Sequence, residues 1–126
     1  MIKKGKIFAL TTLILLGSSM TVFAVQQTKS WSLEYSAIKG TVYSTVRNTG
    51  NATTTEISEK RKSSVKVSIL AYNKTGVPDY TSRKYGPTRD KETTVQSYSN
   101  TDVKVWEAMH STNNSSYNGY TQAVYQ

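Results

Sequence analysis

The sequence predicts an all-β protein: a small antiparallel β-sandwich, or a partly open barrel, after a cleaved N-terminal signal peptide. Three observations predict this class. Apolar and polar residues alternate with a period of two along several segments, and turn-forming residues separate these segments about every ten residues. No window has the spacing of an amphipathic helix. The chain has no Cys, so we expect a core that holds the fold without disulfides.

The N-terminal segment has the three-part order of a secretory signal peptide. Residues 1–6 are basic, residues 7–16 are mostly apolar, and small residues precede a cleavage site after Ala24. An uncleaved membrane anchor is the alternative, although the apolar run is shorter than the ~20 residues that span a bilayer. We therefore expect a signal peptide over residues 1–24 and a single secreted β domain over residues 25–126. Loss of three lysines lowers the net charge from +8 to +5.

Alternation in the first half of the mature chain predicts strands over residues 31–37, 41–47 and 53–58, the last with the weakest pattern. The Asn-Thr-Gly-Asn sequence at 48–51 favours a loop, because Asn and Gly tolerate a left-handed backbone. The clearest alternation covers residues 64–72.

The second half predicts strands over residues 80–85, 93–99, 103–110 and 117–125. Within the last of these, Asn118-Gly119 fits either a tight hairpin turn or a glycine bulge. The residues expected to form the core lie on the apolar faces of these strands: Trp31, Leu33, Tyr35, Val42, Val65, Val67, Ile69, Val103, Val105 and Trp106.

The composition excludes several kinds of chemistry. With no Cys and one His, the chain has no disulfide framework, Cys-ligated zinc site, thiol nucleophile or His-rich metal centre. His110 has no accompanying triad motif, and we expect it half exposed at a strand end with a structural role. Glu107 shares an alternating face with Val103, Val105 and Met109, and we expect the strand to leave the core there or a lysine to pair with it. The sequence therefore predicts a non-enzymatic protein without metal or cofactor.

Basic residues form two local clusters, one in a loop and one around Gly86-Pro87, with tyrosines nearby. Cations beside aromatic rings are typical of surfaces that bind polyanions. The alternative is that these charges only prevent edge-to-edge association of strands. Tyrosines flanked by polar residues near the C-terminus are further candidates. The candidate binding residues are Lys60, Arg61, Lys62, Arg83, Lys84, Arg89, Lys91, Tyr117 and Tyr120.

These features predict a small secreted binding protein. Its expected partner is a cell-wall polymer, an anionic surface or another extracellular protein, and the chain has no specific nucleic-acid motif. The oligomeric state stays open.

One segment suggests a second function. Residues 103–125 contain V-x-V-W-E-A, a polar turn and an aromatic strand, and this cationic, Cys-free pattern resembles the lactococcin-type β-sandwich bacteriocins. The resemblance implies a secreted antibacterial protein acting on Gram-positive cells. It carries no functional residue over to this chain, and it stands as the alternative to simple binding.

Overall fold

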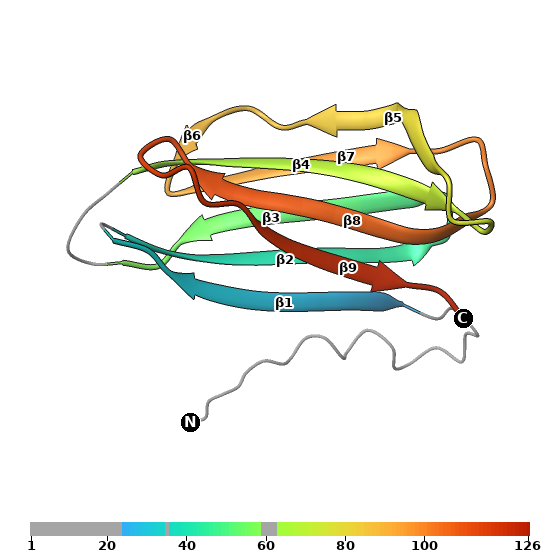
Figure 1. Cartoon of the computed structure of the whole chain (residues 1–126), viewed down its shortest axis with the longest axis horizontal. Helices are drawn as coiled ribbons and strands as arrows, with labels where there is room; N and C mark the ends of the chain where they lie inside the picture. The colour runs from blue at the N-terminus through green and yellow to red at the C-terminus, as the bar shows by residue number, and fades with distance from the viewer. Residues whose placement is uncertain (1–23, 35, 59–62) are drawn as a thin grey trace.

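The computed structural model describes residues 24–34, 36–58 and 63–126 (Figure 1), and within these ranges the chain forms nine strands and no helix. Every pairing between them is antiparallel. The all-β, antiparallel class is therefore confirmed. The strands are β1 (Val25–Ser32), β2 (Ala37–Val46), β3 (Thr49–Glu56), β4 (Ser64–Asn73), β5 (Pro78–Tyr85), β6 (Arg89–Asp90), β7 (Glu92–Tyr98), β8 (Val103–Thr112) and β9 (Gly119–Val124).

Three parts of the sequence prediction lie outside the described residues. They are the signal peptide up to residue 23, the predicted core residue Tyr35, and the loop cluster of Lys60, Arg61 and Lys62. The described ranges contain no helix long and apolar enough to cross a membrane.

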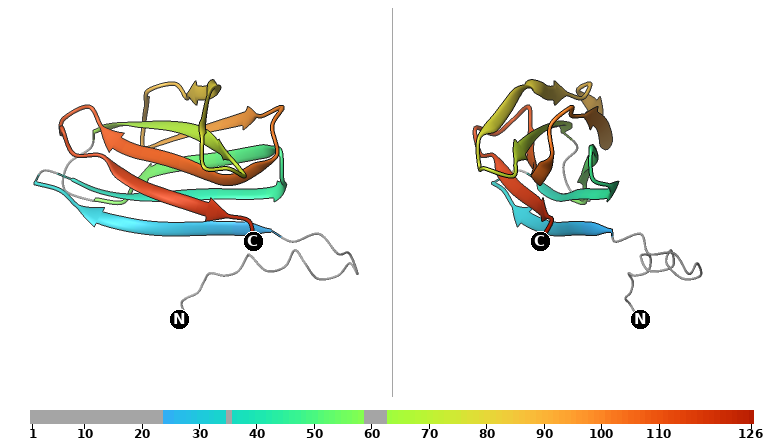
Figure 2. Two further views of the ribbon diagram at one scale, coloured as in Figure 1. Left: turned by 45° about the vertical axis from the view of Figure 1, so that its right-hand side comes forward. Right: turned by 90° about the vertical axis from the view of Figure 1, so that its right-hand side faces the viewer.

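The strands form two sheets that pack face to face, as Figures 1 and 2 show. The first sheet has the order β1-β2-β3-β7, and the second has the order β5-β4-β8-β9 with the short β6 paired to β4. Each sheet keeps two edge strands, so the described strands do not close into a barrel. At one side, β1 and β9 meet through a side chain, because the backbone N–H of Gln122 donates to Gln27 Oε1 at 2.9 Å.

The core lies between the sheets, and Trp106 is its largest fully buried side chain. The indole Nε1–H of Trp106 donates to the carbonyl of Arg47 at 2.9 Å, so its one polar atom is satisfied. The ring lies against the backbone of Gly50, where a Cβ atom would overlap it. A glycine is therefore needed in β3 to let the indole fill the space between the sheets.

Most of the predicted core is buried as expected. Val105 is an exception: it lies half-buried on the outer face, while Val103 and Trp106 point inward. The cause is a register shift between Tyr72 and Asn73 of β4, which places one extra β8 residue between their partners. Trp31 and Leu33 are only partly buried, and Tyr35 is outside the described residues. The predicted residues that the structure buries are Val42, Val65, Val67, Ile69, Val103 and Trp106.

The first predicted strand is wrong in its bounds. β1 begins at Val25 and ends at Ser32, and the chain then turns so that the N–H of Leu33 donates to the carbonyl of Ser36 at 2.7 Å. The inner side of β1 carries Gln27 and Lys29 between Val25 and Trp31, so alternation gives little sign of this strand. The loop predicted at 48–51 is also shorter, since Val46 already pairs with Thr49.

Candidate binding surface

The single histidine lies in the protein interior and not half exposed at a strand end, which corrects the expectation from sequence. His110 has no exposed surface and sits within β8, which continues to Thr112. Its Nδ1 lies 2.7 Å from Thr54 Oγ1 of β3, and its Nε2 lies 2.7 Å from Thr121 Oγ1 of β9. The imidazole therefore links the two sheets through two threonine hydroxyls.

The surroundings of His110 keep it neutral. Burial lowers the pKa of His110 from 6.5 to about 4. The Trp31 ring stacks on the imidazole with centroids 5.7 Å apart, and a Cβ at Gly40 would overlap the imidazole. Because both nitrogens are hydrogen-bonded and the ring is covered, His110 has the geometry of a structural group and not of a base that reaches a substrate.

The outer face of the second sheet carries basic, acidic, aromatic and apolar side chains. One row of side chains crosses all four of its main strands, since Tyr85, Ser68, Met109 and Tyr120 are successive cross-strand partners. Tyr85 is 67% exposed and Tyr120 is 46% exposed, so both rings present area to a partner. The residues on this side of the sheet are Lys66, Ser68, Leu70 and Tyr72 of β4, Val105, Glu107, Met109 and Ser111 of β8, Tyr120, Gln122 and Val124 of β9, and Tyr85 of β5. Ser68, Leu70 and Ser111 among them are buried, so the others form the accessible surface.

Glu107 is the acidic residue at the centre of this face, where its carboxylate is held by two neighbours. Tyr72 Oη donates to Glu107 Oε1 at 3.0 Å, and Gln122 Nε2 donates to Glu107 Oε2 at 3.0 Å. The prediction that Glu107 shares a face with Val105 and Met109 is confirmed, but it is wrong for Val103, which the register shift turns into the core. The strand does not leave the core at Glu107, and the hydrogen-bond partners are Tyr72 and Gln122, not a lysine.

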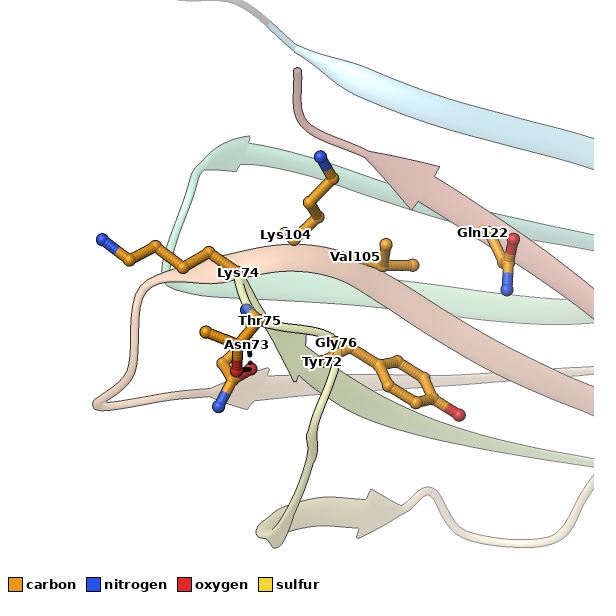
Figure 3. Close-up of a pocket in the computed structure, with 8 residues that line it drawn as sticks. All are labelled: Tyr72, Asn73, Lys74, Thr75, Gly76, Lys104, Val105 and Gln122. Carbon is orange, nitrogen blue, oxygen red and sulfur yellow. Dashed lines mark hydrogen bonds between the residues drawn. The ribbon is translucent and has the colours of Figure 1, made fainter.

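A hollow of about 410 Å³ lies at one end of the face, between the β4–β5 turn and β8–β9 (Figure 3). Lys74 and Lys104 are its cationic lining residues, and Tyr72 contributes an aromatic ring. The turn is fixed by Asn73, whose Oδ1 accepts from the N–H of Thr75 and of Val77 at 3.0 Å each. Lys74 Nζ also lies 3.8 Å from Asp102 Oδ2 in an exposed ion pair, which leaves it accessible.

A second hollow of about 330 Å³ lies at the other end of the face. Lys66, Tyr85 and Met109 line it, together with Ser111 and Asn118. Beside it, Arg83 Nη1 donates to Ser68 Oγ at 3.2 Å, and the guanidinium carbon lies 5.8 Å from the centre of the Tyr85 ring. Basic and aromatic side chains therefore meet at both ends of the face.

The structure does not place the residues predicted from sequence in one patch. Arg83 and Tyr120 belong to the outer face of the second sheet. Lys84 and Arg89 pair with Ile69 and Val65, whose side chains point into the core, so they lie off this face. Lys91 is exposed next to β6. Tyr117 is 44% exposed and packs near Trp31, with ring centroids 6.4 Å apart.

Three basic residues of this surface were not predicted: Lys66, Lys74 and Lys104. Lys66 and Lys74 lie at the two ends of β4, and the pairing of β4 with β8 places Lys104 beside Lys74. Alternation assigns Lys66 to the outer side of β4, and this was the available sequence signal. Lys74 and Lys104 lie at a turn and at a register shift, where alternation carries no information.

Metal ligation is not suggested by the geometry: among the described ranges, no three His, Asp or Glu side chains come together in a way that could hold an ion. Comparisons of the chain with protein-family models, with curated proteins and with solved structures gave no match.

Proposed function

We propose that the protein is exported and binds an anionic cell-wall polymer through the outer face of the second sheet. One observation carries the proposal: Lys66, Lys74, Arg83 and Lys104 border a face on which Tyr85 and Tyr120 are exposed. The export step is supported by the three-part pattern of residues 1–24.

The chemistry of this face suits a polymer with repeated phosphate or carboxylate groups. Lysine and arginine donate charge-assisted hydrogen bonds to such groups, and each cation contributes about 1 kcal/mol near an anionic surface. The polymer's apolar segments would contact Met109, Val124 and the tyrosine rings. Binding of this kind is the sum of several weak contacts, and it weakens as salt screens them.

A non-enzymatic role agrees with the site. His110 is enclosed between two threonines, and both oxygens of Glu107 accept hydrogen bonds from neighbouring side chains. His110 and Glu107 are the two residues that the sequence analysis considered for acid–base chemistry. In the structure, the polar atoms of each side chain are hydrogen-bonded to neighbouring side chains.

Binding to isolated Gram-positive cell walls tests the proposal. In the face variant, Lys66, Lys74, Arg83 and Lys104 become Gln. In the matched control, the exposed residues Lys29, Lys39, Lys84 and Lys91 become Gln, with the same loss of charge. We expect the face variant to bind at least roughly tenfold more weakly than the control, and wild-type binding to fall between about 0.05 M and about 0.5 M salt.

Removal of the phosphate polymers from the walls should abolish the difference between the face variant and its control. Equal binding by the two variants on untreated walls contradicts the proposed face. Binding only to DNA or to anionic vesicles would replace the polymer with that partner. A third variant, with Lys60, Arg61 and Lys62 changed to Gln, tests the loop cluster, whose role stays a prediction from sequence.

The antibacterial alternative is tested by adding the protein to growing Gram-positive cells and following both binding and viability. Adhesion without harm supports the binding function. Loss of viability at sub-micromolar protein would favour the lactococcin-like function instead.

A further inference from the structure

The outer face of the first sheet carries a regular array of hydroxyl and amide side chains that the proposed function does not use. Its central row consists entirely of threonines, one from each strand. Thr28 pairs with Thr41, Thr41 with Thr53, and Thr53 with Thr94, so the row crosses β1, β2, β3 and β7.

Polar rows lie on both sides of the threonines. The row on one side is Gln26, Tyr43, Asn51 and Gln96, and the row on the other side is Ser30, Lys39, Thr55 and Glu92. Neighbouring strands are ~4.8 Å apart, and residues on one face of a strand repeat every ~6.7 Å. The array therefore presents polar groups at two regular spacings.

Cross-strand hydrogen bonds hold the side chains of each row. Thr28 Oγ1 lies 2.9 Å from Thr41 Oγ1 in the central row. Gln96 Nε2 donates to Asn51 Oδ1 at 2.9 Å, and Thr55 Oγ1 donates to Glu92 Oε2 at 3.0 Å. Part of the entropy cost of ordering these groups on binding is therefore already met in the free protein.

The charge of this face indicates a neutral ligand. The charged residues in these three rows are Lys39 and Glu92, which have opposite signs. Both belong to the same flanking row, beside Ser30 and Thr55. Hydroxyl and amide groups both donate and accept hydrogen bonds, as do the hydroxyl groups of sugars. The contrast with the basic outer face of the second sheet argues against a second site for the same anionic groups.

Two exposed tyrosines add flat apolar area to the array. Tyr43 is 40% exposed and Tyr98 is 65% exposed. Tyr98 pairs with Thr49, which lies two residues before Asn51 in β3, while Tyr43 pairs with Asn51 itself. The strand spacings separate the two backbone positions by about 12 Å, which suits a ligand longer than one sugar ring.

We propose that the outer face of the first sheet binds an uncharged polysaccharide strand, with the threonine row in hydrogen bonds to sugar hydroxyls and Tyr43 and Tyr98 against the apolar faces of the rings. This site is independent of the proposed function, because it uses the opposite face of the molecule and no basic cluster (Figure 2).

Retention on three insoluble glycans tests the site: chitin, cellulose and cell-wall glycan freed of phosphate polymers. We expect wild-type retention on at least one of them, with little change between about 0.05 M and about 0.5 M salt. The combined Thr41→Val and Thr53→Val change removes hydroxyls but keeps side-chain shape and strand preference. It should weaken retention at least roughly fivefold, because two hydrogen-bonding groups are lost.

Two matched tyrosine variants complete the experiment. Tyr98→Ala should weaken glycan retention and Tyr85→Ala should leave it within about twofold, although the two rings are almost equally exposed, at 65% and 67%. Tyr98→Ala also remains informative if the threonine variant fails to fold. The proposal is overturned by no retention on any of the three glycans, by retention that the Thr41, Thr53 and Tyr98 changes leave intact, or by retention that salt abolishes. The face variant, which loses the four basic residues of the second sheet, should still bind the uncharged glycans. Failure of one binding site can therefore be distinguished from failure of the other.

Discussion

Replacing Trp106 with Ala should lower the free energy of unfolding by about 3–5 kcal/mol, the cost typical of deleting a buried aromatic side chain. Trp106 is fully buried between the sheets, and the change leaves a cavity that they cannot easily close. Small domains have a total stability of about 5–15 kcal/mol, so the variant should lose a large fraction of the protein's stability. Urea denaturation followed by far-ultraviolet circular dichroism measures this loss.

Gly50 provides the control for this prediction. Gly50→Ala alone should also destabilise the fold, because its Cβ would overlap the Trp106 ring. In the Gly50→Ala, Trp106→Ala double variant, the alanine at position 50 has space, so the combined loss should be smaller than the two single losses added together. Additive losses, or a Trp106→Ala loss below about 1 kcal/mol, would show that the ring does not pack as described.

Acidification should destabilise the protein by about 3 kcal/mol through His110 alone. The folded pKa is about 4, below the ordinary 6.5, so the unfolded chain binds a proton more readily than the folded chain between these values. Stability due to neutral His110 is therefore complete above about pH 6.5 and is lost as the pH falls toward 4. One pKa unit corresponds to about 1.4 kcal/mol, which gives the size of the loss.

The difference between wild type and His110→Gln isolates this contribution, because carboxylates titrate in part of the same range in both proteins. Gln keeps a donor and an acceptor near Thr54 and Thr121 but does not titrate. Denaturation at several pH values between 7 and 4.5 should give a steeper fall for wild type. Parallel curves for the two proteins would mean that folding does not lower the pKa of His110, which would contradict the buried, neutral imidazole.

The sequence predicted the fold class because β4 alternates clearly and turn-forming residues separate it from several shorter segments with the same period. The sequence placed both Val105 and Trp106 in the core, although consecutive residues cannot both face inward in a regular strand. The register shift opposite Tyr72 and Asn73 decides the matter, and no local pattern announces it.

The candidate binding surfaces were harder to predict from the sequence than the fold class. Runs of basic residues mark clusters that are local in the chain, whereas Lys74 and Lys104 line one hollow only through the pairing of β4 with β8 and the turn after β4. The threonine row is similar, because Thr28, Thr41, Thr53 and Thr94 align only once three registers are set. His110 also depends on tertiary structure, since Thr54 lies 56 residues away in sequence.

The proposed binding face is tested most directly by nitrogen–proton NMR of the protein during titration with a soluble phosphate polymer such as poly(glycerol phosphate). Amide signals of Lys66, Tyr85, Lys104 and Met109 should shift progressively, because these residues line or border the outer face of the second sheet. Signals from the centre of the first sheet, such as Thr53, should stay in place and serve as the internal reference. Shifts confined to the first sheet, or no shifts on the outer face of the second sheet at low salt, would contradict the proposed function.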